Sequence, residues 1–462
     1  MATQEMTDET TTARPRSWAH QIEAFRFAVE KSAAMLAMDM GTGKSKVAVD
    51  LLAAWDARNV LILAPLSVLS VWRREFATHD PRGVEPVILD RGAGDWKRKR
   101  AAEAIAAGRP VVVNYESAWR DPLGSLLVKT FWDAAVCDES HRIKSPQGKA
   151  SKLAARVGIV SKRRLCLTGT PMPHSPLDLY AQFRFLDRSV FGTSYTAFRA
   201  RYAVTNPMFA SQVVRWINEV ELQDKYHSLA FRVRARDVLS LPEVVHQTRE
   251  VSLSPKARVV YNELQREMVA RIDSGEITAA NALVKLLRLQ QITSGFVAAD
   301  DSEPVELCHA KKYALQEIIE DIDPSEPVVV FCRFRRDLEV VRDLAERLGR
   351  RYDEVSGTRR DLTATAEMRP GCQVLGVQIQ SGGVGIDLTR ARYAVYYSLG
   401  FSLGDYEQSL ARVHRPGQTR TTFYYHLVAT NTVDEAVYGA LRKRRDVVTA
   451  VLDGIKLGGT KA

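Results

Sequence analysis

Residue types suited to binding a nucleotide occur near the start of the chain, at positions 41–45. An apolar run enters this glycine turn and a potential helix leaves it, so free N–H groups at the helix start can receive phosphate oxygens. We expect Lys44 to reach the β- and γ-phosphates of ATP and the Ser45 hydroxyl to ligate Mg²⁺. Met38 stands where the usual pattern has glycine, so this turn needs support from carboxylates elsewhere. The expected ATP-binding residues here are Gly41, Thr42, Gly43, Lys44 and Ser45.

Those carboxylates are Asp138 and Glu139, which end an apolar run that begins at Ala134. Ligands bind at the carboxyl ends of strands in parallel α/β sheets. We expect Asp138 to hold the Mg²⁺ that Ser45 also touches, and Glu139 to polarise the water that attacks the γ-phosphate. Adjacent carboxylates are common on ordinary loops. The pair becomes informative because it follows a phosphate-binding turn with another buried strand between them.

Other polar groups are candidates for roles around this site. The Gln21 carboxamide offers the donor and the acceptor that an adenine edge requires, although a surface glutamine is usually only solvated. Residues 164–171 resemble a strand that ends in a hydroxyl-rich turn. There Thr168 and Thr170 can hydrogen-bond toward the carboxylate pair or toward His141, and so couple the site to parts that move.

The elements that must position these groups alternate between apolar runs and helical patterns, which predicts an α/β fold with doubly wound, mostly parallel sheets. Buried strands are expected at residues 59–65 and 111–115. The strand signal fades from residue 191 to about 300, where the pattern is helical. A second α/β unit follows, with strands at 328–332 and 374–378. A chain of 462 residues is expected to form two or three domains.

The charge balance suits a polyanionic partner. Lys and Arg number 65 against 55 Asp and Glu, giving a net charge of +10 and a pI near 9.3. A basic run at residues 96–100, WKRKR, leads into a helical pattern. Such a run is either a solvated helix face or a nucleic-acid contact.

Composition also bounds the setting of the protein. The five cysteines are far apart and form no CxxC pair, so we interpret them as small core residues in a reducing, intracellular environment. No apolar run approaches the ~18 residues of a membrane span, so no membrane association is expected. The polar, Thr-rich start of the chain is expected to be disordered and is not a secretory signal.

Four stretches, GTGKS, LAPLSVLSVW, DESH with RIKS, and LTGTPMPHSPLDLYAQFRFLD, resemble motifs I, Ia, II and III of superfamily 2 helicases. More narrowly they are similar to the SWI/SNF-like ATPases, and the compact chain resembles bacterial and bacteriophage members. Four positions depart from the family pattern. Ser140 stands where many members have Ala, Met38-Asp39 where they often have Asp-Glu, and Asp387 where many have Asn.

The second half of the chain resembles motifs V and VI. The resemblance implies that Gly385 and Asp387 touch the nucleotide. It also implies that Arg412 and Arg415, expected on one helical face, stabilise negative charge on the γ-phosphate from the opposite domain. Outside this context, two such arginines are usually solvated. The resemblance further implies nucleic-acid backbone contacts by Ser67, Tyr115, Ser381, Gly382 and Gly383, and a coupling role for Gln408.

The implied architecture is two RecA-like P-loop domains with ATP in the cleft between them. The expected parts are a disordered tail 1–14, a first domain 15–190, a helical insertion and linker 191–300, a second domain 301–450 and a tail 451–462. The expected function is an ATP-dependent motor, foremost a translocase on double-stranded or branched DNA, acting as a monomer with ATP and Mg²⁺. The alternatives are a strand-separating DNA or RNA helicase, and a nucleotide-gated DNA-binding clamp with little turnover.

Overall fold

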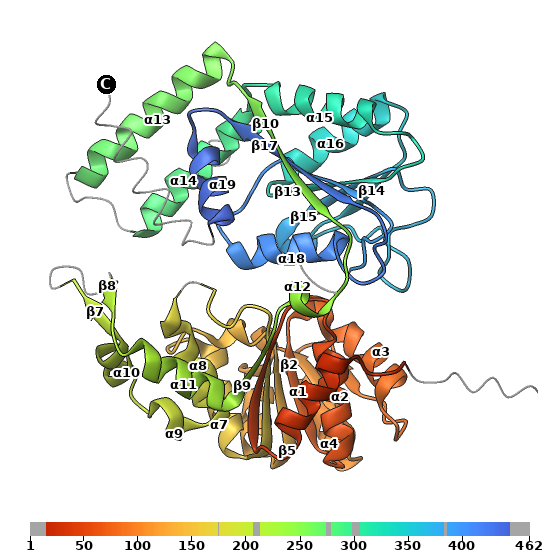
Figure 1. The fold of residues 1–462 in the computed structure, drawn as a ribbon, viewed down its shortest axis with the longest axis vertical. Helices are drawn as coiled ribbons and strands as arrows, with labels where there is room; N and C mark the ends of the chain where they lie inside the picture. Colours follow the sequence, from red (N-terminus) through yellow and green to blue (C-terminus); the bar gives the residue numbers. More distant parts are fainter. Residues whose placement is uncertain are drawn as a thin grey trace, which may run out of the picture. The chain divides into compact units, whose positions relative to one another are not determined.

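The computed structural model describes residues 15–173, 175–206, 213–273, 279–297, 305–382 and 386–443. The chain forms two compact units, unit 1 up to Val238 and unit 2 from Leu239 onward. Each unit is built on a parallel β-sheet with helices packed on it (Figure 1). The predicted α/β fold class is therefore confirmed. The predicted tails 1–14 and 451–462 lie outside the described residues.

Unit 1 contains a seven-stranded sheet in the order β3-β4-β2-β5-β6-β1-β9, and all neighbouring strands are parallel. Its central strands are apolar and buried along their length, as expected for strands covered on both faces. The strands are β1 (Ala33–Met38), β2 (Val60–Ala64), β3 (Val87–Leu89), β4 (Val111–Asn114), β5 (Trp132–Asp138), β6 (Ser161–Leu167) and β9 (Ala230–Val233).

Helices connect these strands, and an antiparallel hairpin of β7 (Ala203–Thr205) and β8 (Val213–Trp216) lies between the helices α10 and α11. The α-helices are α1 (Ala19–Val29), α2 (Lys44–Ala54), α3 (Leu69–His79), α4 (Gly94–Ala106), α5 (Tyr115–Ala118), α6 (Leu123–Lys129), α7 (Lys149–Ile159), α8 (Leu179–Leu186), α9 (Arg188–Phe191), α10 (Tyr195–Tyr202), α11 (Glu219–Leu229) and α12 (Ala235–Val238). Three short 3₁₀ helices are η1 (Leu66–Val68), η2 (Ser140–Ile143) and η3 (Pro176–Asp178).

Unit 2 contains a six-stranded parallel sheet in the order β10-β17-β16-β13-β15-β14. Its strands are β10 (Val244–Val251), β13 (Val328–Cys332), β14 (Tyr352–Val355), β15 (Val374–Gln378), β16 (Tyr393–Tyr396) and β17 (Thr422–Ala429), and a small antiparallel pair is formed by β11 (Phe296–Val297) and β12 (Val305–Glu306). Its helices are α13 (Pro255–Asp273), α14 (Ala279–Ser294), α15 (Ala310–Asp321), α16 (Arg335–Arg347), α17 (Ile379–Gly382), α18 (Leu403–Val413) and α19 (Val433–Arg442).

The segment predicted as a helical insertion, 191–300, is more varied than its sequence indicates. It does contain the helices α10, α11, α13 and α14, but β9 completes the sheet of unit 1 and β10 forms an edge of the sheet of unit 2. The change from one unit to the other falls between these two strands. The strand β10, VVHQTREV, was missed because an exposed edge strand carries polar residues and lacks a continuous apolar run.

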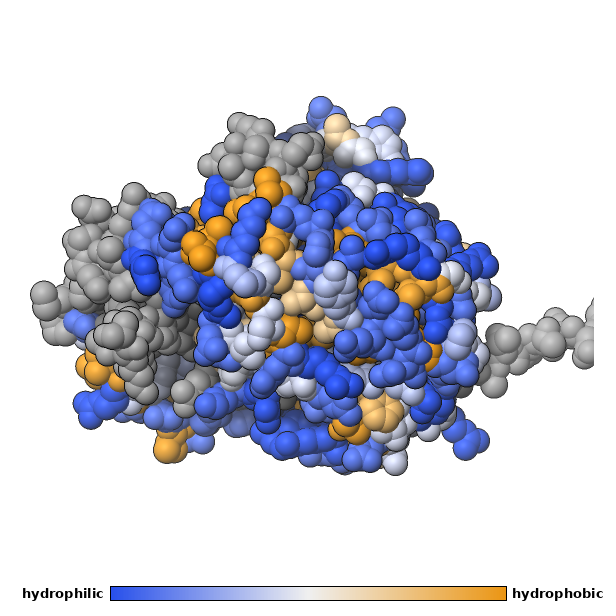
Figure 2. Space-filling view, turned by 90° about the horizontal axis from the view of Figure 1, so that it is seen from above, coloured by the Kyte–Doolittle hydropathy of each residue, from blue (hydrophilic) through white to orange (hydrophobic). Residues whose placement is uncertain are grey.

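The surface is predominantly polar on the face seen in Figure 2, where hydrophobic residues form small separate groups among hydrophilic ones. Scattered apolar side chains of this kind are normal for a folded chain. Among the helices of the described residues, none has both the length and the apolar composition needed to cross a bilayer.

Candidate nucleotide-binding site

The phosphate-binding turn connects β1 to α2, and two of its glycines have left-handed backbone. Gly41 has φ of 77° and Gly43 has φ of 83°, a region that side chains disfavour. A Cβ atom at position 43 would lie 2.2 Å from Nε2 of Gln21, so a larger residue there would combine backbone strain with a displacement of the Gln21 side chain. Lys44 begins α2 and is buried, and Ser45 follows it in the first turn. The predicted strand, turn and helix are therefore present.

Side chains from α1 fix the carbonyl of the loop at Thr42. Nε2 of His20 lies 2.9 Å from this carbonyl oxygen, and Nε2 of Gln21 donates to it at 3.2 Å. The Gln21 carboxamide oxygen accepts from the backbone N–H of Trp18 at 2.9 Å. Both ends of Gln21 are thus engaged within the chain. An adenine contact by Gln21 stays a prediction, and it requires an exchange of these partners.

A cavity of about 500 Å³ lies beside Gln21, between the start of α1 and the outer side of α2. This volume is within the usual range for small-molecule pockets. Lys46 lines the cavity and donates from Nζ to Ser17 Oγ and to Asp50 Oδ2, both at 2.7 Å. The cavity combines apolar walls with polar groups at its edge, which is suitable for a nucleotide base.

The carboxylates Asp138 and Glu139 lie at the carboxyl end of β5, and both are buried. Oδ2 of Asp138 accepts from the indole N–H of Trp72 at 3.1 Å, and Oδ1 accepts from the backbone N–H of Glu139 at 3.0 Å. Burial and the neighbouring Glu139 charge raise the pKa of Asp138 to about 7, while the Lys44 ammonium opposes this rise. Glu139 has φ of 49°, a strained conformation of the kind found at functional sites.

These residues fit a Mg²⁺ ion. Mg²⁺ prefers oxygen ligands, and protein sites supply one or two of them beside substrate phosphates and water. Ser45 offers a hydroxyl and Asp138 a carboxylate. The raised pKa of Asp138 reflects two crowded carboxylates in a buried position, and a divalent cation would offset that negative charge.

Tyr115 was predicted to contact a nucleic-acid backbone, and the structure assigns it a different place. Its side chain is buried in the core of unit 1, and its hydroxyl donates to the backbone carbonyl of Asp138 at 2.7 Å. The side chain is therefore not available to a ligand at the surface. Tyr115 instead holds the end of β5, from which the Asp138 carboxylate projects.

The predicted coupling groups of unit 1 are brought together. Nδ1 of His141 lies 3.4 Å from Oε2 of Glu139 and 3.4 Å from Oγ1 of Thr168. The backbone N–H of Thr170 donates to the same threonine hydroxyl at 3.1 Å. A polar chain thus runs from the water-activating candidate to the turn after β6.

A second connection, which the sequence did not reveal, involves Ser140 and Gln182. The Ser140 hydroxyl donates to Oε1 of Gln182 at 2.7 Å, and both side chains are fully buried. Nε2 of Gln182 donates to the carbonyls of Pro171 and Asp178 at 2.7 and 2.9 Å. Gln182 therefore joins the carboxylate segment, the turn after β6 and helix α8. The serine that departs from the family pattern is the residue that makes this bond possible.

In unit 2 the two arginines do not share a helical face, so that prediction is wrong. Arg412 is buried on α18, but α18 ends at Val413 and Arg415 lies in the turn beyond it. The residue before a proline disfavours helical backbone, and Pro416 follows Arg415 directly. The Arg-Pro-Gly sequence was therefore the signal for this ending.

Arg415 reaches the residue predicted to touch the nucleotide in motif V. Its Nη1 lies 3.6 Å from Oδ2 of Asp387 and 3.5 Å from the carbonyl of Ile386. Oδ1 of Asp387 accepts from the backbone N–H and the hydroxyl of Thr389 at 2.9 and 2.7 Å. The backbone N–H of Asp387 donates to the carbonyl of Ala366 at 3.0 Å. The structure thus places parts of motifs V and VI in contact within one unit.

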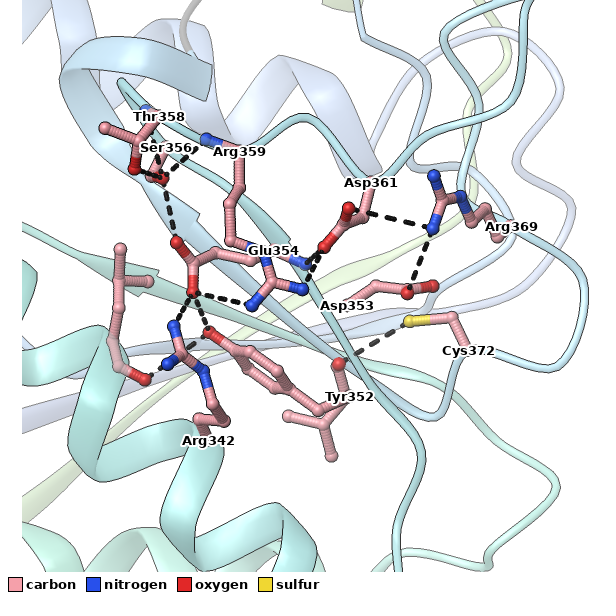
Figure 3. A network of polar contacts seen from close by, with 12 residues as sticks. Arg342, Tyr352, Asp353, Glu354, Ser356, Thr358, Arg359, Asp361, Arg369 and Cys372 are labelled. Carbon is pink, nitrogen blue, oxygen red and sulfur yellow. Dashed lines mark hydrogen bonds and ion pairs between the residues drawn. The ribbon is translucent and has the colours of Figure 1, made fainter.

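The loop that carries Ala366 is anchored by the network of polar contacts in Figure 3. Glu354, on the edge strand β14, pairs with Arg342 of α16, and its backbone N–H donates to Oδ2 of Asp361 at 3.1 Å. Arg369 lies 3.6 Å from Asp353 and 3.7 Å from Asp361. The network therefore holds the segment after β14 against the sheet, where it supports Asp387.

The remaining predicted residues are only partly described. Gln408 is buried on α18. Ser67 belongs to η1, and Ser381 and Gly382 belong to α17, but the side chains of the two serines are not described. Gly383 and Gly385 lie outside the described residues. Their contacts with nucleotide and nucleic acid stay predictions.

Comparison with known families decides the class of the chain. Residues 20–295, more than half of the chain, match the SNF2-related domain. The chain belongs to the SNF2-related family. Residues 310–417 also match the helicase conserved C-terminal domain. The predicted membership of the SWI/SNF-like branch of superfamily 2 is confirmed, and with it the class of ATP-hydrolysing enzymes.

Individual relatives of this SNF2-related chain are similar at low identity. A protein designated p41, from Acyrthosiphon pisum secondary endosymbiont phage 1, is 27% identical over 474 residues, covering 96% of this chain and 99% of that protein. An uncharacterized ATP-dependent helicase of Mycoplasma pneumoniae is 25% identical, covering 91% and 40%. The DNA repair and recombination protein RDH54 of Saccharomyces cerevisiae is 22% identical, covering 88% and 50%. The chain thus spans nearly all of p41 but half or less of the other two relatives.

Proposed function

We propose that this chain is an ATP-dependent motor that moves along double-stranded DNA. The observation that carries the proposal is the cluster in unit 1, where Lys44 opens α2 and Asp138 and Glu139 lie buried at the end of β5. An acid pair whose burial raises the pKa of Asp138, beside a lysine whose charge lowers it, is suited to a metal-bound triphosphate. A protein that only bound nucleotide, without hydrolysing it, would have no need for such a buried pair of carboxylates.

Each group of unit 1 has one role in hydrolysis. Bound Mg²⁺ supplies positive charge that stabilises the negative charge developing on the phosphates. Lys44 binds the β- and γ-phosphates, and Ser45 and Asp138 would hold the ion. Glu139 orients the attacking water and accepts its proton. His141, 3.4 Å from Glu139, keeps this carboxylate in place and connects it to Thr168.

The arginines of unit 2 complete this mechanism. Arg412 and Arg415 supply positive charge to the γ-phosphate during the transition state, as arginine fingers do in related phosphoryl transfers. Arg415 is held by Asp387 at 3.6 Å, so its guanidinium is oriented before use. The catalytic groups belong to two units. The chain can therefore switch between two conformations as one ATP is bound and hydrolysed.

DNA is proposed as the track because of charge and relatives. The net charge of +10 favours a polyanion, and RDH54 is named a DNA repair and recombination protein. A motor that steps over any sequence must hold the backbone, whose contacts carry no sequence information. The predicted contacts are Ser67 and the segment 381–383, and binding should weaken steeply with salt. We propose that the chain acts as a monomer.

The test compares ATP hydrolysis on different nucleic acids. Stimulation that is much greater with duplex or branched DNA than with single strands supports the translocase. Displacement of a labelled strand from a duplex would instead support the second candidate, a strand-separating helicase. ATP-dependent DNA binding with little hydrolysis on any substrate would leave the third, a nucleotide-gated clamp.

The role of Glu139 can be tested in the same assay. Glu139→Gln should lower turnover by about 100-fold or more while ATP and DNA binding persist, because the amide cannot accept the proton. Glu320→Gln, the same change at an exposed site on α15, is the matched control. Unchanged turnover in Glu139→Gln would remove this residue from the mechanism.

A further inference from the structure

A polar cavity of about 490 Å³ lies along β3, the edge strand of the sheet in unit 1. It is separate from the cavity beside Gln21, because the two cavities share no lining residue. Its walls come from α3, β3, α4 and the segment before β4. The lining residues with side chains able to bind a ligand are Arg73, Glu85, Asp90, Arg91, Trp96, Arg100 and Arg109.

The aromatic wall of this cavity is Trp96, a residue that is 38% exposed. Gly92 has φ of 83°, and a Cβ atom there would lie 2.5 Å from Cε3 of the indole. The turn before α4 therefore packs directly on the ring. One part of the indole ring is therefore held by the backbone and another part faces the cavity, so the ring offers a fixed surface for stacking.

The side chains of the basic run WKRKR lie in three different surroundings. Lys97 points inward, where it is buried and donates to Ser117 Oγ at 2.8 Å. Arg98 and Lys99 are exposed and do not line the cavity. Trp96 and Arg100, one helical turn apart, both line it. The run is thus more than a uniformly solvated face.

The charges of the cavity favour an anion. Arg109 is satisfied by Glu85 at 3.0 Å, and Arg100 pairs with Glu103 at 2.9 Å at the helix surface. Among the residues that the structure describes, Arg73 and Arg91 have no carboxylate partner. Asp90 also lines the cavity, so these two arginines face one further carboxylate and still leave a net positive charge. Together with the exposed indole, they can bind a phosphate and stack on a base.

We propose that this cavity binds one nucleotide unit of a single-stranded nucleic acid, with its base on Trp96 and its phosphate at Arg73 and Arg91. The cavity is large enough for one nucleotide. A base inside a duplex is already stacked, so only an unpaired nucleotide can use the indole. The inference goes beyond the proposed motor, because it adds a second nucleic-acid contact that does not depend on hydrolysis.

Such a contact would let the protein hold a displaced or unpaired strand. An acidic peptide is the other ligand that arginines on an edge strand could accept, since a peptide can add to the free edge of β3. The indole favours the nucleotide, because carboxylates have no ring to stack on it. The peptide is therefore an outcome for the experiment to exclude.

The experiment measures binding of fluorescein-labelled dT20 to the full chain, without ATP, over a range of salt concentrations. Trp96→Ala should weaken binding by about five-fold or more, and Trp96→Phe should restore much of it, because stacking needs a ring. Arg73→Ala with Arg91→Ala should weaken binding and lower the slope of log affinity against log salt by about 0.7 for the lost phosphate contact. The control Arg98→Ala with Lys99→Ala removes the same charge from the solvated side of α4 and should change affinity by less than about two-fold.

Two competitors identify the ligand. If dTMP displaces dT20 from the unmodified chain but not from Trp96→Ala, a free nucleotide is sufficient for binding. If dTMP does not displace dT20, a strand is required. Displacement by poly-glutamate that depends on Trp96 would overturn the proposal, as would equal losses in the arginine pair and its control. Duplex-stimulated ATP hydrolysis should be unchanged in Trp96→Ala. If the unmodified chain shows no duplex-stimulated hydrolysis, the proposed motor function is contradicted. The cavity proposal is then judged by the dT20 binding data alone.

Discussion

Trp72 donates its indole N–H to Oδ2 of Asp138 over 3.1 Å, and both side chains are buried. Trp72 belongs to α3, which follows η1, the segment predicted to touch nucleic acid through Ser67. One hydrogen bond therefore connects the helix that follows the predicted track-binding segment to the predicted metal ligand. A displacement of α3 would change how strongly the Asp138 carboxylate is held, and so how well it binds Mg²⁺.

Replacing Trp72 with Phe should raise the Mg²⁺ concentration needed for half-maximal ATP hydrolysis by about ten-fold. The indole N–H is lost while most of the aromatic ring remains. Mutation of a residue that hydrogen-bonds a metal ligand typically lowers metal affinity or activity by about 10- to 100-fold. A Mg²⁺ titration of the hydrolysis rate measures the effect. Trp132→Phe is the control, because its indole donates to the carbonyl of Leu127 at 2.9 Å, outside the site. Equal titrations for both variants would contradict the role given to Trp72.

A double-mutant cycle on Ser140 and Gln182 should show an interaction free energy of about 0.5–3 kcal/mol. Ser140→Ala leaves a buried amide oxygen without its donor, which costs about 1–3 kcal/mol in the free energy of unfolding. In Gln182→Leu that oxygen is absent, so the serine change should then cost less. Denaturant unfolding followed by tryptophan fluorescence reports on this unit, because all seven tryptophans belong to unit 1.

The control cycle pairs Ser140→Ala with Ser161→Ala. Ser161 lies at the start of β6, where its hydroxyl donates to the carbonyl of Val157 at 2.7 Å. Ser161 is paired with Trp132 at the start of β5, whereas Ser140 follows the end of that strand. Changes at separated sites should add within about 0.5 kcal/mol. Additivity in both cycles would mean that the Ser140 bond contributes nothing specific.

Arg415→Ala should lower the rate of ATP hydrolysis by about 1,000-fold with little change in KM, because the guanidinium acts on charge that appears only in the transition state. Asp387→Asn should cause a smaller loss, since the amide oxygen can still accept from Thr389 while the charge opposite Arg415 is removed. Arg420→Ala, which removes a surface pair with Glu326, is the control. A large rise in KM at constant kcat would assign Arg415 to nucleotide binding instead.

The sequence was sufficient for the parts of the site that follow one another along the chain. The apolar run before Gly41 and the end of the run at Asp138 predicted β1, α2 and β5 because strand ends and glycine turns have local signals. Contacts between distant segments have none. The bonds of Trp72 to Asp138 and of Ser140 to Gln182 depend on how α3 and α8 pack on the sheet, and periodicity does not contain that information.

Two predicted roles failed for physical reasons that differ. Tyr115 was assigned a nucleic-acid contact by the family resemblance, but its ring is buried and its hydroxyl is satisfied by a backbone carbonyl. Arg415 was placed on the helix of Arg412 by its spacing alone. Spacing fixes a shared face only if the helix continues, and Pro416 gave a local reason for it to end.

Unit 2 should lose stability in mild acid because of His426. This ring is fully buried in the unit, stacked on Tyr396 and bonded at Nε2 to the Tyr406 hydroxyl at 2.9 Å. Burial, with the nearby His246 and Arg442, lowers the pKa of His426 to about 3, against 6.5 for the unperturbed group. The unfolded state therefore binds a proton as pH falls below 6.5 while the folded state does not. The linked loss between pH 7.5 and pH 5 is about 2 kcal/mol.

Hydrogen exchange of β17 at pH 7.5 and pH 5, corrected for intrinsic rates, measures this loss in the full chain. Tryptophan fluorescence follows unit 1 in the same samples and serves as an internal reference. His426→Gln should be less stable at both pH values, because the stacked ring is lost, but should lack the additional loss in acid. His227→Gln, a change at an exposed histidine of unit 1, should leave the acid response of β17 intact. An unchanged acid response in His426→Gln would show that another group of unit 2 takes up the proton.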